Sequence, residues 1–231
     1  MTASEKLANY LKTHPTAIGK VVDFDVRQDS LYQFDFTAAN AAINPALVSD
    51  TVAFAKWVDE QLEAHHCRYG IGGYMEHRTL YASSALFDTD DEPRRLHLGI
   101  DIWGPTGTPI YSPLPATVHS FNDNNNVGDY GGTIILTHHL PDLTLYSLYG
   151  HLSRKSLDGL EVGQPIAISE QIATLGDITE NGHWPPHLHF QLMFDIQGSK
   201  GDYPGVGQYS KKAQYLQNIL DPNLLLQFPE A

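Results

Sequence analysis

Cysteine, basic residues and long apolar runs are all scarce in this 231-residue chain. A single cysteine, Cys67, excludes an internal disulfide framework and the thiolate-rich kind of structural zinc site. The 14 Lys and Arg residues against 27 Asp and Glu give a formal charge of −13, so we expect neither nucleic acid nor an anionic membrane surface as a partner. No stretch approaches the roughly 20 apolar residues of a membrane span, and the first residues lack the apolar core of a signal peptide. These absences favour a cytoplasmic protein that spans no membrane.

Histidine, by contrast, is abundant, with 12 residues. The remaining composition, 42% hydrophobic and 18% charged, excludes a disordered chain and a coiled coil and is typical of a globular protein. A chain of this length buries roughly 70% of the surface that its unfolded form exposes, so it needs no metal merely to fold. The histidines are therefore the residues most informative about function.

Residues 1–85 predict a small α+β region. Alternating apolar and polar residues at 22–26 and 31–36 predict two strands, which can form a hairpin that turns at 28–30. One long helix is expected over about 45–66, because Asn44 suits an N-cap, Pro45 suits the first turn, and apolar residues then recur at helical spacing.

Residues 86–231 predict a mainly β domain with a C-terminal helical tail at about 211–226 that is interrupted at Pro222. Short apolar runs alternate with clusters of Gly, Pro and Asn, and no helical pattern separates them, which favours an antiparallel sandwich or a partly open barrel. The eight expected strands cover 96–102, 109–111, 116–121, 132–138, 144–149, 165–168, 173–175 and 188–194.

Two clusters combine residue types that bind metal. His97 and Asp101 would lie about 13 Å apart on a regular strand, so they can share one ion only if the chain bends at Gly99 between them. His187 and His189 point to the same face of one predicted strand, so both imidazoles can line one cleft. The spacing leaves open which of these two histidines would bind the ion.

His151 is a third element, because it follows the strand-like run 145–149 after a single glycine. Two histidines and one aspartate suit zinc, since a catalytic zinc ion keeps its fourth position open for water, whereas a structural one fills it with a protein ligand. Further histidines near such an ion can accept a proton or stabilise an oxyanion.

Four motifs within about residues 94–195 resemble, in their order, the lysostaphin-type zinc metallopeptidase family, whose members mostly cut the peptides of peptidoglycan. The motifs are His97-x-x-x-Asp101, the segment Gly104-x-x-Gly107-Thr108-Pro109-Ile110-Tyr111-Ser112-Pro113, Leu148-Tyr149-Gly150-His151-Leu152 and Pro186-His187-Leu188-His189-Phe190.

The resemblance implies an antiparallel β-sandwich of the duplicated hybrid motif type and a zinc-dependent endopeptidase that acts on peptidoglycan cross-links or wall-derived peptides. It makes His97, Asp101 and His189 the ligands of one Zn²⁺. It makes His151 and His187 the catalytic pair that activates water and stabilises the tetrahedral intermediate.

Five further residues are candidate substrate contacts. The resemblance places His183 and Trp184 on the rim of the groove, just before the motif of His187 and His189. Many family members carry small residues where this chain has Trp184 and Pro185, so a bulky, stiff rim is expected to narrow or reshape the groove. Tyr149 can line the cleft, although tyrosine in a strand more often serves packing. Glu76 or Arg78 can enter the cleft from the N-terminal region and bind a peptide amine or carboxylate, the alternative being a solvated turn with an ion pair.

Other histidines have simpler explanations. His138 and His139 are expected at the surface near a strand end, and His65 and His66 close the long helix, where imidazolium interacts favourably with the helix dipole.

Two other functions stay open at this stage. The chain can be a non-catalytic metal-binding or regulatory module on the same fold, or a zinc hydrolase of a different bond, because fold alone does not set function. A peptidoglycan substrate would require export, for which the sequence shows no signal. The sequence does not indicate an oligomeric state.

Overall fold

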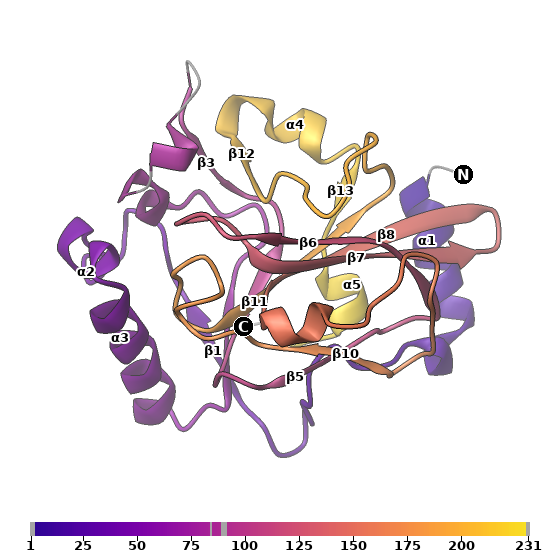
Figure 1. The fold of residues 1–231 in the computed structure, drawn as a ribbon, viewed down its shortest axis with the longest axis horizontal. Coiled ribbons are helices and arrows are strands. Elements are labelled where there is room, and N and C mark those ends of the chain that lie inside the picture. Colours follow the sequence, from indigo (N-terminus) through magenta and orange to yellow (C-terminus); the bar gives the residue numbers. More distant parts are fainter. Residues whose placement is uncertain (1–2, 84, 89–91, 230–231) are drawn as a thin grey trace.

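The fold is built around one large sheet of nine strands (Figure 1), in a computed structural model that describes residues 3–83, 85–88 and 92–229. The strands β1 and β2 run parallel, and the other neighbours in the sheet run antiparallel. The ninth strand, β13 (Ile219–Leu220), pairs with β11 outside the main order. That order is β1 (Leu31–Phe34), β2 (Tyr69–Gly72), β4 (Ile100–Trp103), β11 (His187–Met193), β8 (Leu143–Leu152), β7 (Gly131–Leu140), β6 (Ala116–Asn124) and β9 (Pro165–Ile166).

Two small sheets cover the two faces of the large one. The first pairs β5 (Pro109–Tyr111) with β10 (Gln171–Thr174), and the second pairs β3 (Arg94–His97) with β12 (Val206–Gln208). Neighbouring residues of β7 enter different cores. Ile134 belongs to the same core as Ile110 of β5, and Ile135 belongs to the same core as Leu96 of β3. The prediction of a mainly β chain with packed antiparallel sheets is confirmed.

The N-terminal region adds helices and two strands to this frame. In Figure 1, α2 (Pro45–Ser49) and α3 (Thr51–Ala64) lie at one side of the molecule and α1 (Ala3–Thr13) lies at the other. The helix α3 buries Phe54, Val58 and Leu62 in an aromatic-rich core that also contains Phe34 of β1 and Trp103 of β4. This core joins the N-terminal region directly to the strand that carries Asp101.

The predicted helix over 45–66 is wrong in one respect, because the chain forms two helices there. Asn44 caps α2 as expected, but the side chain of Asp50 accepts a hydrogen bond from the backbone N–H of Ala53 and starts α3. Asp50 itself has an extended backbone, with ψ at 96°. The cap therefore divides the apolar pattern into two helices.

The predicted hairpin of 22–26 and 31–36 is also wrong. Residues 22–26 form no strand, and β1 pairs in parallel with β2, more than 30 residues later in the chain. The predicted tail helix over 211–226 is reduced to two single turns, α4 (Lys212–Tyr215) and α5 (Asn223–Leu226), because β13 adds a short edge pairing between them.

All eight strands predicted for the second region are present, with boundaries that differ by a few residues. The strand expected at 96–102 is split into β3 and β4 at Leu98 and Gly99, which is the bend that the metal hypothesis requires. A Cβ at Gly99 would lie 2.6 Å from the carbonyl oxygen of Phe190, so glycine permits a close approach of β11. None of the described helices is long and apolar enough to cross a membrane.

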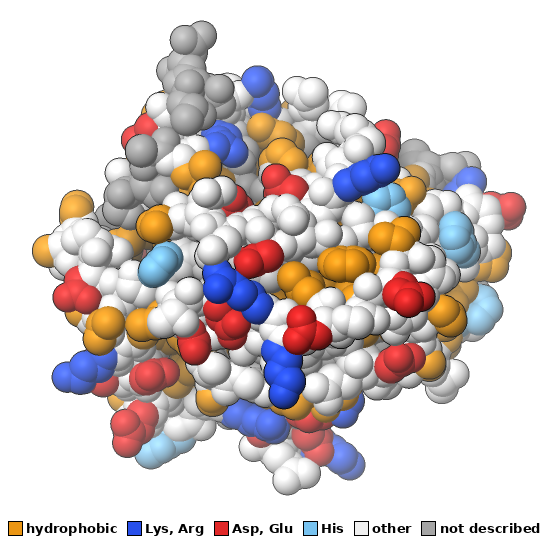
Figure 2. Space-filling view, viewed as in Figure 1, with side chains coloured by type: hydrophobic (Ala, Val, Ile, Leu, Met, Phe, Trp, Pro, Cys, Tyr) orange, Lys and Arg blue, Asp and Glu red, His pale blue; other side chains and the backbone are white. Residues whose placement is uncertain are grey.

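On the face shown in Figure 2, acidic and basic side chains are interspersed and do not gather into a basic patch. The chain as a whole carries 27 acidic and 14 basic residues.

His138 is fully buried, which corrects its expected surface position, whereas its neighbour His139 is exposed as expected. The ring Nδ1–H of His138 donates to the carbonyl of Pro115 at 3.1 Å, and Nε2 lies 2.7 Å from the hydroxyl of Ser147. Burial, opposed by the Pro115 carbonyl, lowers the pKa of His138 from 6.5 to about 4. The fold therefore accepts this histidine in its neutral form.

We expect His138 to make the free energy of unfolding fall below pH 6.5. Between pH 6.5 and 4 the unfolded state binds the proton and the folded state does not, so stability is full above pH 6.5 and is lost progressively as the pH falls toward 4. At about 1.4 kcal/mol per pKa unit, the loss is roughly 3 kcal/mol. Urea unfolding at pH 7.5 and 4.5 should show a smaller pH dependence in His138→Gln than in the native chain, and equal dependence would contradict the assignment.

Candidate active site

Three side chains from three strands converge next to a cavity, and two of them, Asp101 and His189, line it. Asp101 Oδ1 lies 3.1 Å from His97 Nε2 and 3.1 Å from His189 Nδ1, and these two nitrogens are 3.0 Å apart. All three residues are buried. Within the described part of the chain, this is the group of histidine and carboxylate ligands arranged closely enough to hold a metal ion.

The strand arrangement explains this convergence. His189 and Asp101 are directly opposite each other on the paired strands β11 and β4. His97 ends β3, and the bend at Gly99 brings its ring back over Asp101. A Cβ at Gly99 would lie 2.8 Å from the His189 ring, so a side chain there would displace one member of the group.

Hydrogen bonds on the far sides of the rings decide which nitrogen atoms carry protons. His97 Nδ1–H donates to the carbonyl of Gly73 at 2.8 Å, and His189 Nε2–H donates to Gln191 Oε1 at 3.0 Å. Two nitrogen lone pairs and one carboxylate oxygen therefore face one another with no proton between them. Such a group can hold a cation.

The donor set fits zinc. Ligands at about 2.0–2.1 Å from a tetrahedral zinc ion lie about 3.3 Å apart, and the three donor atoms here are 3.0–3.1 Å apart. Two histidine nitrogens and one carboxylate oxygen also leave the fourth position of a tetrahedral ion for water or substrate.

His151 and His187 lie beside this group with ring centroids 4.1 Å apart. His151 Nδ1–H donates to the carbonyl of Asn181 at 2.8 Å, and His187 Nδ1–H donates to the carbonyl of Pro185 at 2.7 Å. Each ring thus keeps the lone pair of Nε2, and His187 Nε2 lies 3.9 Å from Asp101 Oδ1.

The backbone also constrains these two histidines. His151 has a φ of 62°, in the left-handed region that residues with side chains rarely adopt. Its backbone N–H donates to the carbonyl of Tyr130 at 2.7 Å, which stabilises this conformation. His187 stacks on Trp103 at a centroid distance of 4.0 Å, which fixes the plane of its ring. Both rings are held in place by their surroundings.

The electrostatics of the site keep three of its imidazoles neutral. Burial lowers the pKa of His97 and of His187 from 6.5 to about 4, and burial together with the nearby His187 lowers the pKa of His151 well below its usual range. Burial alone would raise the pKa of Asp101, but His97 and Arg78 outweigh it and hold this pKa well below the usual range. Neutral imidazoles beside a carboxylate are the protonation states that a metal ion needs.

The structure places Arg78 in the wall of the cavity, as one of the two sequence interpretations expected, with Glu76 beside it. Arg78 is 1% exposed, so it is not on a solvated turn, and its guanidinium forms an ion pair with Asp101 Oδ2. Glu76 is half-buried and accepts hydrogen bonds from Arg78 Nε at 2.7 Å and from the backbone N–H of Phe36 at 3.1 Å. Both charges have protein partners, but Arg78 Nη2 is buried without a hydrogen-bond partner, so a role in binding a peptide terminus stays a prediction.

The prediction that Tyr149 contacts substrate is wrong. Tyr149 is fully buried in the main core, where its ring packs on Phe190 with a centroid distance of 5.2 Å. Because side chains alternate along a strand, Tyr149 and Phe190 point away from the face that carries His189. The tyrosine is a packing residue, the commoner role weighed in the sequence analysis.

The two rim residues differ in position. Trp184 lines the cavity, and its backbone is held by the buried side chain of Asn181, which accepts from the Trp184 N–H and donates to the Trp184 carbonyl. His183 is exposed with a φ of 64°, and its carbonyl accepts a hydrogen bond from Thr51. The structure thus brings Trp184, and not His183, into the wall of the cavity.

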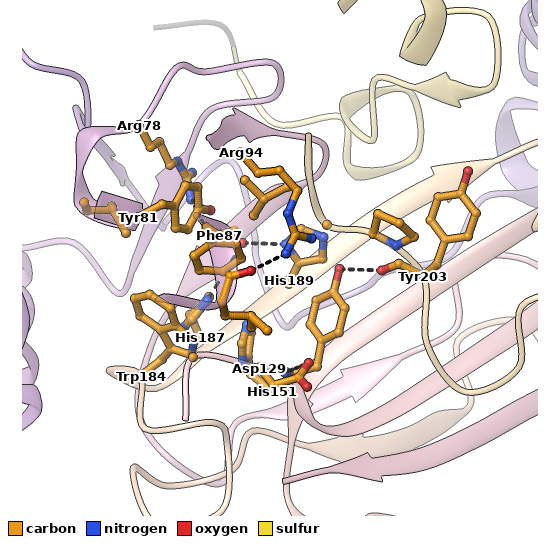
Figure 3. Close-up of a pocket in the computed structure, with 18 of the residues that line it drawn as sticks. Arg78, Tyr81, Phe87, Arg94, Asp129, His151, Trp184, His187, His189 and Tyr203 are labelled. Carbon is orange, nitrogen blue, oxygen red and sulfur yellow. Dashed lines mark hydrogen bonds and ion pairs between the residues drawn. The ribbon is translucent and has the colours of Figure 1, made fainter. Parts of the chain in front are cut away.

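The cavity encloses about 830 Å³ including its mouth, and its wall combines segments from across the chain (Figure 3). The sequence analysis missed most of this wall, because the N-terminal segment 80–87 and the loop 202–206 carry no recognisable motif. Gln191, which orients His189, could have been found, since it is two positions along the same strand face. The main missed wall residues are Tyr81, Phe87, Arg94, Asp129, Tyr130 and Tyr203.

A comparison with known protein families matches the segment of the chain that contains these histidine and aspartate residues. Residues 95–202 match the model of "Peptidase family M23". This M23 segment makes up 108 of the 231 residues of the chain. The resemblance to lysostaphin-type peptidases is thereby confirmed, and the M23 segment contains all five histidine and aspartate residues of the site. No curated protein matches the chain significantly.

Solved structures of similar proteins include bacterial peptidases. The catalytic domain of the antimicrobial peptidase lysostaphin from Staphylococcus simulans is 23% identical, with 58% of this chain and 81% of that one covered and a TM-score of 0.39. The prophage-encoded M23 protein EnpA from Enterococcus faecalis is 22% identical, with 51% and 78% covered and a TM-score of 0.36. A zinc-containing peptidase from Vibrio cholerae is 26% identical over 42% of this chain, with a TM-score of 0.34, and the match spans 27% of that peptidase's length.

Proposed function

We propose that the chain is a zinc-dependent peptidase in which His97, Asp101 and His189 hold the ion. The observation that supports this most is the convergence of two histidine lone pairs and one carboxylate oxygen within 3.1 Å, with the protons directed away from the group. When bound there, zinc would supply a Lewis acid that polarises the scissile carbonyl and makes water a nucleophile near neutral pH.

His151 and His187 serve the proton transfers and the developing negative charge. Each is neutral and presents Nε2, while its Nδ1–H is fixed on a backbone carbonyl. A neutral imidazole can accept a proton at Nε2 from the attacking water, and the resulting N–H can donate to an oxyanion or to the leaving amine. The short distance between the rings disfavours protonation of both at once, so the pair holds one additional proton at a time, which the ring that accepted it from water returns to the leaving amine.

The substrate that the family favours is a peptide of peptidoglycan, either in a cross-link or as a wall-derived fragment. The aromatic wall of the cavity suits apolar parts of such a ligand. An intact wall would require export of the chain, whereas soluble wall fragments would not.

The test is chelator-sensitive cleavage. The zinc-loaded protein should cleave at least one member of a panel of muropeptides and synthetic peptides, and 1,10-phenanthroline should abolish cleavage until zinc is restored, because the histidine pair needs the polarised carbonyl. Mass spectrometry of the products identifies the bond, with His187→Ala as the inactive control. A zinc-loaded protein that binds the panel but cleaves nothing would support the non-catalytic module, and products cut at a non-peptide bond would support a different hydrolase.

A further inference from the structure

Arg78 is an ionised side chain buried next to the proposed metal ligands but contributed by the N-terminal region, outside the M23 segment. Its Nη1 donates to Asp101 Oδ2 and lies 3.0 Å from the hydroxyl of Tyr81, and its Nε donates to Glu76 Oε2 at 2.7 Å. Figure 3 shows Arg78 and Tyr81 together on one side of the cavity.

Glu76 ties this arginine to the backbone. Its second oxygen, Oε1, accepts the N–H of Phe36 at 3.1 Å, and Phe36 is fully buried. The guanidinium also lies 5.1 Å from the centroid of the Phe36 ring. A continuous series of hydrogen bonds therefore runs from the Phe36 backbone through Glu76 and Arg78 to Asp101.

Gly72 provides the space that this arrangement needs. A Cβ at Gly72 would lie 2.5 Å from Arg78 Nη2, so most side chains at that position would displace the guanidinium. The glycine-rich end of β2 and the charged segment after it thus form one structural unit around Arg78.

Asp101 divides its two oxygens between different partners. Oδ1 lies 3.1 Å from a nitrogen of His97 and of His189, whereas Oδ2 is occupied by Arg78. We infer that Arg78 is a positioning residue of the metal centre, which holds Asp101 so that it offers Oδ1 alone to the ion. This inference rests on the proposed zinc site, and it makes the N-terminal region part of that site.

Zinc affinity distinguishes positioning from the other effects of the arginine. Loss of the positive charge near the ion would by itself strengthen cation binding. A carboxylate that is free to rotate would weaken binding, and loss of such outer hydrogen bonds typically costs about 10–100-fold in metal affinity. A fall in affinity therefore reports lost orientation and not lost charge.

The experiment measures Arg78→Met and Arg78→Lys, with Arg95→Met as the matched control. Arg95 also forms an ion pair, but its partner is Asp88 and not Asp101. Zinc affinity is measured by competition with a chromogenic chelator. The affinity should be about 10–100-fold lower in Arg78→Met than in the native chain. It should be intermediate in Arg78→Lys, because the lysine ammonium cannot bond Glu76 and Asp101 in the fork geometry of a guanidinium. The visible absorption of the Co²⁺-loaded protein should change in Arg78→Met, since Asp101 can then present both oxygens, and should be unchanged in Arg95→Met.

Unchanged or higher zinc affinity in Arg78→Met, with a native Co²⁺ spectrum, would overturn the inference. If Arg78→Met does not fold, Glu76→Gln and Arg78→Lys decide the question by the same measurements, since both retain a positive charge at position 78. A native chain that binds no zinc would instead overturn the proposed function, so the two failures are distinguishable.

Discussion

Replacing His189 with alanine is expected to abolish stoichiometric zinc binding, whereas replacing His151 is expected to preserve it and to reduce turnover by about 10²–10⁴-fold. His189 supplies one of three converging donor atoms, and its loss leaves an incomplete ligand set. His151 faces the same cavity, but its Nδ1–H is fixed on Asn181 and its ring lies beside the donor group and not within it. Metal content after dialysis, combined with kcat on a cleaved muropeptide, measures both effects.

His139→Ala is the matched control, because His139 is an exposed histidine on β7 and should alter neither quantity. His187→Ala should behave as His151→Ala does. Equal loss of zinc from the His151, His187 and His189 variants would contradict this division of roles.

Replacing Asp101 with alanine is expected to destabilise the metal-free protein by about 3–5 kcal/mol, in addition to removing a zinc ligand, because it removes one of the two carboxylates that pair with the buried guanidinium of Arg78. The double variant Asp101→Ala/Arg78→Met removes both charges. The double variant should lose about 1–3 kcal/mol less stability than the losses of Asp101→Ala and Arg78→Met added together. Urea unfolding in the presence of a chelator measures all three variants.

Asp101→Asn separates the two roles of this aspartate. The amide oxygen can still accept from Arg78 and the amide N–H can donate to the histidine lone pairs, so this variant should be more stable than Asp101→Ala while binding zinc poorly. For the double variant Asp101→Ala/Arg78→Met, a stability loss equal to the sum of the two single losses would show that Arg78 and Asp101 are energetically independent, which would contradict the prediction.

Much of the site follows from patterns that are local in sequence. The alternation of side chains along a strand places His187 and His189 on one face, and glycine at position 99 permits the bend that joins His97 to Asp101. These relations span a few residues, so a single sequence is enough to predict them. The assignment of roles to individual histidines came from the family resemblance and stays a prediction until the variants are measured.

The remaining features depend on contacts between distant segments. The ion pair of Arg78 and Asp101 joins positions 23 residues apart, and nothing in the sequence marks them as partners. The parallel pairing of β1 with β2 likewise needs the whole intervening chain, including α3, to be folded. A local signal did exist for the break between α2 and α3, since Asp50 is a good N-cap residue, but the continuous apolar spacing hid it.

The pairing of β2 with β4 also affects how the molecule behaves toward other copies of itself. The strand β4 carries Asp101, and β2 and β1 place two further strands between it and the open edge of the sheet. A chain cut after β2 would present β4 as an edge strand with unpaired backbone groups, which favours pairing between molecules. The four-residue β1 ends the sheet in a short edge, so the N-terminal region protects the aspartate-bearing strand from aggregation.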